Sequence, residues 1–188
     1  KLFRYIDLLQ RWTKSSNLVA PSTLDDLWNR HIMDSAQLLS IKPEARRWLD
    51  MGSGGGLPGL VVAILLSESQ GAEVQLVESN AKKAAFLNAV AAELDLPVTI
   101  HRVRIEEAYA RTKPPEIVTA RALTALHDLL RLARPWLDEG AIGLFHKGRD
   151  FVGELAKSRD DWGFDLIEHP SVIDPESRIL EIGGLRSR

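Results

Sequence analysis

The chain has 188 residues, of which 45% are hydrophobic, and a formal net charge of −2. This length fits one domain, and the apolar content is sufficient for a buried core. The absence of cysteine excludes a disulfide framework and a thiolate metal site. The five histidines lack the spacing of a metal-binding pair, and no apolar run approaches the ~18 residues of a membrane span. We therefore expect no metal and no membrane segment.

The chain begins with Lys1 rather than Met, so we expect that further residues precede it in the natural protein. The composition is otherwise typical of a cytoplasmic protein, and we expect a monomer. Charge is unevenly distributed, because residues 1–47 and 102–149 each carry a net charge of +3, whereas residues 48–101 and 150–188 each carry −4. If the two positive stretches meet, they form a surface for an anionic partner. On composition alone, scattered solvated charges are the simpler explanation.

The first 45 residues predict a helical cap on the same domain as residues 46–188. Phe3 to Trp12 carries apolar residues at helical spacing, and a polar break follows at 13–17. Ser22-Thr23 resembles the N-cap of a second helix that runs to about Leu39, because acidic residues occupy its first turn. The connector 42–44 contains a proline.

From residue 47 onward, short apolar runs alternate with helical patterns. This repetition is typical of an α/β fold with a mostly parallel sheet and helices on both faces. Two late strands lack a long helix between them, so we expect an antiparallel hairpin at the sheet edge. The expected strands are 47–51, 73–78, 98–103, 116–120, 141–146, 164–168 and 179–182, and the expected helices are 60–66, 81–94, 105–110, 123–137 and 151–158.

The most informative segment is Trp48-Leu-Asp-Met-Gly-Ser-Gly-Gly-Gly-Leu-Pro-Gly59, a glycine-rich turn between a strand and a helix. Such a turn lets a ligand approach the backbone, and the helix N-terminus that follows favours an anionic group. A dinucleotide fingerprint requires glycine at the sixth position of the turn, where this chain has Leu57, and a Walker A loop is excluded because no G-K-[ST] follows. The pattern D-x-G-x-G-x-G resembles motif I of the S-adenosylmethionine-dependent methyltransferases with a Rossmann-like fold.

Three further positions lie at strand ends, where the carboxyl edge of a parallel sheet gathers ligand-binding residues. Glu78 follows the second strand and suits the hydroxyls of a ribose, although a solvated strand-end acid is the simpler alternative. Ile105-Glu106 follows the third strand, where helix-capping acids are equally common. Arg121 follows the fourth strand and can hold a carboxylate, a phosphate or the O6/N7 edge of guanine. The tetrapeptide [DN]-P-P-[YF], which many amino-group methyltransferases carry after this strand, is absent, which disfavours an exocyclic amino acceptor.

Taken together, these motifs resemble the bacterial small-subunit rRNA guanine-N7 methyltransferases, also called glucose-inhibited division protein B. The resemblance covers residues from about 12 to 150, and Leu57 and Gly55 depart mildly from the usual Phe and Ala. The motifs that carry it are Asn17-Leu18, Arg30-His-Ile-Met-Asp-Ser35, Asp50 to Gly59, Leu76-Val-Glu-Ser79, Lys82-Lys83 with Phe86-Leu87, Thr119-Ala-Arg-Ala122 and Lys147-Gly148.

The resemblance implies that the chain methylates guanine N7 in 16S rRNA within the small ribosomal subunit or its precursor. It implies that S-adenosylmethionine binds at Gly52, Ser53, Gly54, Gly56, Leu57, Glu78, Ile105, Glu106 and Arg121. Arg121 and Lys147 are the implied catalytic residues, and Arg30, His31 and Lys147 the implied RNA contacts. The alternatives are a small-molecule methyltransferase of the same fold and a non-catalytic S-adenosylmethionine-binding protein. A structural role remains the simpler interpretation of His146.

Overall fold

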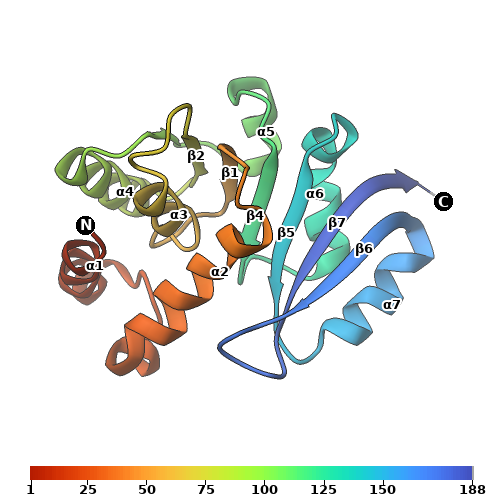
Figure 1. The fold of residues 1–188 in the computed structure, drawn as a ribbon, viewed down its shortest axis with the longest axis horizontal. Coiled ribbons are helices and arrows are strands. Elements are labelled where there is room, and N and C mark those ends of the chain that lie inside the picture. Colours follow the sequence, from red (N-terminus) through yellow and green to blue (C-terminus); the bar gives the residue numbers. More distant parts are fainter. Residues whose placement is uncertain (188) are drawn as a thin grey trace.

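A computed structural model describes residues 1–187 and contains one seven-stranded sheet (Figure 1). The strand order is β3-β2-β1-β4-β5-β7-β6, with β1 to β5 parallel and β7 antiparallel to both β5 and β6. The predicted α/β class, the mostly parallel sheet and the antiparallel edge hairpin are therefore confirmed. The strands are β1 (Arg47–Met51), β2 (Glu73–Val77), β3 (Val98–His101), β4 (Ile117–Arg121), β5 (Ile142–Lys147), β6 (Trp162–Pro170) and β7 (Arg178–Ser187).

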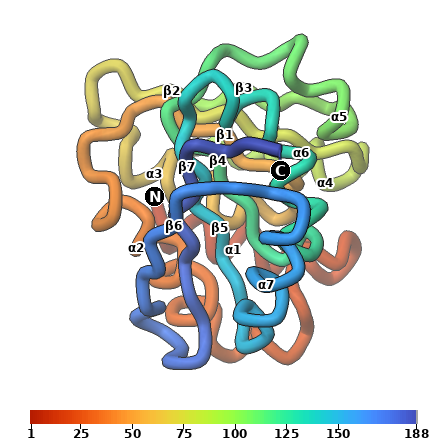
Figure 2. Tube along the Cα trace, turned by 90° about the vertical axis from the view of Figure 1, so that its right-hand side faces the viewer, coloured from red at the N-terminus to blue at the C-terminus, as the bar shows by residue number. Residues whose placement is uncertain are grey.

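Helices cover both faces of the sheet because the buried strands are apolar on both sides. Trp48 faces the core shared with α1 to α4, whereas the next residue, Leu49, faces the core shared with α6 and α7. Figure 2, turned by 90° from Figure 1, shows the β6–β7 hairpin on the side that faces the viewer. The helices are α1 (Leu2–Ser16), α2 (Asp34–Ile41), α3 (Gly59–Leu65), α4 (Ala81–Leu94), α5 (Ile105–Ala108), α6 (Leu126–Asp138) and α7 (Phe151–Asp161), with the 3₁₀ segments η1 (Pro21–Asp26) and η3 (Tyr109–Arg111) and the π-helical segment η2 (Trp28–Met33).

The predicted second helix of the cap is wrong in its details. Residues 21–41 form three consecutive segments, the 3₁₀-helix η1, the π-helix η2 and the α-helix α2. Ser22-Thr23 is not the N-cap, since η1 begins at Pro21, and the Thr23 hydroxyl bonds the Ala20 carbonyl oxygen. Helical spacing of apolar residues does not separate these three helix types. A π turn changes which side chains share a face, and such turns often occur at functional sites.

Several predicted boundaries were also wrong. The strand expected at 98–103 ends at His101, and the late strands are longer than expected. The helix expected at 123–137 begins only at Leu126, because the chain turns after β4 at Ala122, whose φ is +50°. Within residues 1–187, no helix is both long and apolar enough to cross a bilayer.

Candidate active site

The glycine turn after β1 is fixed to the neighbouring strand β2. The backbone N–H groups of Gly52 and Ser53 both donate to the Val77 carbonyl oxygen, at 2.9 and 3.0 Å. Gly54 adopts a positive φ of 55°, a conformation that favours glycine, and a Cβ atom there would meet only the Gly52 carbonyl oxygen, at 3.8 Å. The open space in front of Gly54 belongs to a cavity. The turn therefore exposes bare backbone to that cavity, as a nucleotide-type ligand requires.

This smaller cavity has a volume of about 300 Å³ and contains five of the predicted cofactor residues, namely Gly52, Gly54, Glu78, Ile105 and Glu106. Its wall also includes residues that sequence reasoning missed, namely Val77, Ser79, Lys83, Val103, Arg104, Ala122 and Leu123. The missed residues flank predicted ones along the chain, so wider windows at each strand end would have found them.

Four predicted cofactor residues are not on the wall of the smaller cavity, namely Ser53, Gly56, Leu57 and Arg121, of which Arg121 lines a larger cavity described below. Ser53 is buried, and its hydroxyl donates to the Asp50 carbonyl oxygen at 3.0 Å. Leu57 is buried in the core beside α3, and Gly56 has no room for a side chain because a Cβ would lie 2.3 Å from Leu60 Cδ1. Ser53, Gly56 and Leu57 therefore lie on the side of the turn that faces the protein interior. They shape the turn, and their direct contact with a cofactor stays a prediction.

Glu78 closes one side of the smaller cavity with a buried carboxylate. Its Oε2 accepts from the Gly54 N–H at 2.9 Å, and its Oε1 accepts from the Asn80 N–H at 2.7 Å. Carboxylate oxygens have spare lone pairs and can accept hydroxyl donors in addition. The bare backbone of the turn, the acceptor carboxylate at its rim and the apolar Ile105 together fit a nucleoside-containing cofactor.

Asp50 holds the glycine turn from behind. Its carboxylate accepts from the Gly59 N–H at 3.2 Å and from the Thr119 hydroxyl at 2.9 Å, which joins β1, α3 and β4. Burial raises the pKa of Asp50 to about 6, although the hydrogen bonds from Thr119, Ser53 and Gly59 oppose this shift. The leading acid of the motif is therefore a structural anchor that lies outside both cavity walls.

The N-terminal cap covers the outer side of the same turn. The buried Tyr5 hydroxyl, on α1, donates to the Gly55 carbonyl oxygen at 2.6 Å. A Cβ at Gly55 would lie only 3.2 Å from the Leu18 carbonyl oxygen and from Leu9 Cδ1. Glycine at 55, where the resembling family usually has alanine, thus allows close approach of the cap. No local pattern links residues 5 and 55, so this contact could not be predicted from the sequence.

A larger cavity of about 530 Å³ adjoins the smaller one, because Ala122 and Leu123 line both. Arg30, Arg121 and Lys147 lie on its wall, as do Asp34 and Glu154. The connection between β6 and β7 supplies a further wall through Ser171, Ser177 and Arg178, and Gln37 of α2 accepts from the Val172 N–H at 3.0 Å. The structure therefore brings together the family motifs near residues 30, 121 and 147 that are far apart in the sequence.

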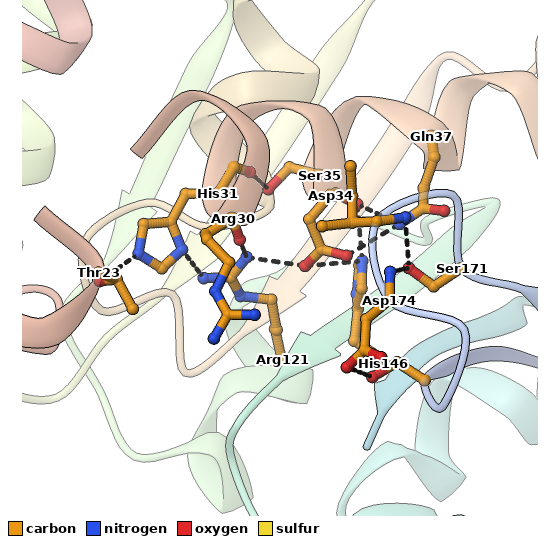
Figure 3. A network of polar contacts seen from close by, with 12 residues as sticks. Thr23, Arg30, His31, Asp34, Ser35, Gln37, Arg121, His146, Ser171 and Asp174 are labelled. Carbon is orange, nitrogen blue, oxygen red and sulfur yellow. Dashed lines mark hydrogen bonds and ion pairs between the residues drawn. The ribbon is translucent and has the colours of Figure 1, made fainter. Parts of the chain in front are cut away.

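Arg121 bridges β4 and the cap (Figure 3). One terminal nitrogen donates to Asp34 Oδ2 at 2.9 Å and to the Arg30 carbonyl oxygen at 3.2 Å, and the other contacts His31 Nδ1. The opposite ring nitrogen of His31 pairs with the Thr23 hydroxyl at 2.8 Å. His31, in the π-helical segment, and Asp34, at the start of α2, thus contact the same guanidinium.

The two histidines of this region both have lowered pKa values. Burial lowers the pKa of His31 to about 4, and the positive charge of Arg121 lowers it further than burial alone would. Burial also lowers the pKa of His146, whose Nε2 lies 2.9 Å from the Asp34 carbonyl oxygen. His31 is not on the wall of either cavity, so its predicted RNA contact stays a prediction.

Lys147 is buried, and two protein acceptors hold its ammonium. Nζ donates to the Thr124 carbonyl oxygen at 2.7 Å and lies 2.7 Å from Glu154 Oε2. Arg30, in contrast, is exposed. Within residues 1–187, no group of three or more His, Asp or Glu side chains is placed to hold a metal.

Known proteins resemble this chain in sequence and in fold. A profile of the family described as rRNA small subunit methyltransferase G matches residues 1–179. The ribosomal RNA small subunit methyltransferases G of Brucella canis and Brucella suis are each 53% identical to the chain, over all of it and 88% of each relative.

Among solved structures, magnesium protoporphyrin IX methyltransferase from Synechocystis with bound S-adenosylmethionine aligns with a TM-score of 0.61 at 16% identity, over 96% of this chain and 90% of that one. A fibrillarin/Nop5p complex aligns with a TM-score of 0.60 at 14% identity, over 81% and 82%. These similarities support a Rossmann-like methyltransferase fold. From its motifs and the match over almost its whole length, the chain belongs to the rRNA small subunit methyltransferase G family of S-adenosylmethionine-dependent enzymes.

Proposed function

We propose that the chain transfers a methyl group to N7 of a guanine in 16S rRNA. The observation that carries this proposal is the pair of adjoining cavities that meet at Ala122 and Leu123. The smaller cavity has the glycine turn and Glu78 of a nucleoside cofactor site, and the larger has cationic side chains at its wall. A guanine that entered the larger cavity would face the cofactor across this shared boundary.

S-adenosylmethionine, when bound, supplies an electrophilic methyl group on a sulfonium. Among the residues of the chain, Glu78 would accept from the ribose hydroxyls with its carboxylate, beside the bare backbone of Gly52 and Gly54. Ile105 would pack on the adenine, and Glu106 would meet its edge. Arg121 would orient the cofactor or the guanine with the donors of its guanidinium that the cap does not occupy.

The arrangement of residues suits an acceptor that needs no deprotonation. Guanine N7 carries a lone pair and no proton, so no general base is required. Burial lowers the pKa of both His31 and His146, which makes each a weaker base. His31 also has polar partners on both ring nitrogens and His146 on one, which argues further against a proton-accepting role. Rate enhancement would come from alignment of the reactants and exclusion of water, and alignment alone can contribute up to ~7–11 kcal/mol.

An RNA substrate is favoured over a small molecule by the cations around the larger cavity. Arg30 is exposed at its wall, and Arg178 reaches the wall from the β6–β7 hairpin. Arginine suits phosphate and the guanine edge because its planar fork donates two parallel hydrogen bonds. A small-molecule methyltransferase needs no such surface.

We further propose that the chain acts as a cytoplasmic monomer, which sedimentation of the purified protein would test.

The decisive experiment maps N7-methylguanine in rRNA by mass spectrometry, in cells with and without the gene. Purified protein with S-adenosylmethionine should then restore the modification in small subunits from the deficient cells. Free guanine nucleotides should remain unmethylated under the same conditions. Methylation of metabolites but not of subunits would favour the small-molecule alternative, and absence of cofactor binding in calorimetry would contradict both.

A further inference from the structure

The turn between β4 and α6 forms part of both cavities. Ala122 and Leu123 line both, whereas Thr124 and Ala125 line only the larger. Ala122 has a φ of +50°, a conformation that costs a residue with a Cβ about 1–2 kcal/mol. A turn in such a conformation persists only if its surroundings hold it there. The residues that hold this turn therefore fix the segment that separates the two cavities.

One ion pair, between the buried Lys147 and the partly buried Glu154, contacts the turn at two residues. Lys147 Nζ, at the end of β5, donates to the Thr124 carbonyl oxygen at 2.7 Å. Glu154 Oε2, on α7, accepts from the Leu126 N–H at 2.6 Å and pairs with the same Lys147 ammonium at 2.7 Å. Lys147 Nζ and Glu154 Oε2 thus link Thr124 and Leu126 to β5 and α7.

Glu154 also supplies what the start of α6 lacks. The N-cap residue, Ala125, has no side chain that could accept a hydrogen bond, so the first helical N–H groups depend on an external acceptor. A carboxylate at this end is additionally favoured by the helix dipole. Lysine and glutamate side chains are rarely buried unless paired, and here only 7% and 28% of them are exposed.

We infer that Lys147 and Glu154 act as one positioning unit for the turn 122–126. Both residues place the boundary between cofactor and guanine, and neither needs to contact RNA or the reacting atoms. This role differs from the catalytic and RNA-binding roles that the family resemblance implies for Lys147, which stay predictions. It rests on the proposed function, because the turn is assumed to separate the methyl donor from its guanine acceptor.

The test is a double-mutant cycle of Lys147→Met, Glu154→Met and the combined variant. The single-turnover rate is measured on small subunits from deficient cells, at saturating subunits and saturating S-adenosylmethionine. Each single variant should lower this rate on the order of 100-fold, since misplacement of reactants by about 1 Å has that effect. The combined variant should be no slower than the single ones, because the two residues act together. Affinities for S-adenosylmethionine and for subunits should change little.

Two variants serve as controls. Lys113→Met breaks the exposed Lys113–Glu73 ion pair of 2.8 Å, outside both cavities, and should keep the wild-type rate. If a single variant fails to fold because it leaves one buried charge unpaired, the combined variant carries no such charge and still tests the inference. A wild-type rate in the combined variant would overturn it.

Other roles for Lys147 give different results. If it contacts a phosphate, Lys147→Met lowers the salt dependence of subunit binding by about one unit, and Glu154→Met does not. If it touches the reacting base, Lys147→Met is far slower than Glu154→Met. Either result overturns the positioning role. Should the wild type fail to methylate subunits, the proposed function is wrong. Hydrogen exchange then still tests the contact, because the Leu126 amide must exchange faster in Glu154→Met than in the wild type.

Discussion

The hydroxyl of Tyr5 is expected to stabilise the cofactor site through one buried hydrogen bond. In Tyr5→Phe, the ring keeps its packing, but the Gly55 carbonyl oxygen loses the donor that approaches it at 2.6 Å. A buried acceptor left without a partner costs about 1–3 kcal/mol. For a domain of this size each kcal/mol lowers Tm by about 2–4 °C, so a cost near the middle of that range corresponds to a loss of about 4–8 °C.

Thermal unfolding of the two proteins, without ligand and with saturating S-adenosylmethionine, measures this effect. Tyr109→Phe is the matched control, because the Tyr109 hydroxyl bonds Glu139 on the surface. Removal of the Tyr109 hydroxyl should lower the free energy of unfolding by about 0.5 kcal/mol or less. We also expect Tyr5→Phe to bind S-adenosylmethionine more weakly, since the turn is then held only by packing on its outer side. The reasoning is refuted if the two variants unfold at the same temperature.

Three further results are expected. His31 has a pKa of about 4 when folded, below its unfolded value, so it lowers stability as the pH falls from about 6.5 to 4, by up to ~3 kcal/mol. Asp50, with its pKa raised to about 6, acts in the opposite direction but is present in both proteins. In urea unfolding, the change in stability from pH 7 to pH 4.5 should therefore be more favourable in His31→Gln than in the wild type, by about 2–3 kcal/mol, and equal changes in the two proteins would contradict this. Ala122→Gly should lower the free energy of unfolding by less than the ~1 kcal/mol expected for Ala85→Gly on the exposed face of α4. The reason is that Ala122 has a positive φ and Ala85 does not, and equal losses in denaturant titrations would contradict this. Arg30→Gln should reduce the slope of subunit affinity against salt by about one unit, and an unchanged slope would exclude a phosphate contact.

The sequence was most informative where structure follows from local pattern. The strands and helices from Arg47 onward were predictable because apolar spacing reports directly on burial, and the glycine turn because its chemistry lies in consecutive residues. Glu78 was predictable for a related reason, since parallel strands end at one edge. These elements are sufficient to place the smaller cavity.

Contacts between distant segments could not be predicted in the same way. The Tyr5–Gly55 hydrogen bond and the Lys147–Glu154 pair depend on how helices pack on the sheet, which no local pattern encodes. The π turn at 28–33 was missed because its apolar spacing resembles that of an α-helix. Arg121 was correctly placed at a strand end, but its partners in the cap became visible only in three dimensions.

The two cavities also differ in when their walls exist during synthesis. Every residue that lines the smaller cavity lies between Gly52 and Leu123, whereas the larger cavity needs the segment from Ser171 to Arg178 as well. β7 is inserted between β5 and β6, so the last strand to be made completes the sheet beside that larger cavity. A nascent chain therefore carries all residues of the smaller cavity about 50 residues before those of the larger cavity are complete. On the proposed function, the residues that would hold the methyl donor are synthesised before the last of those that would select what is methylated.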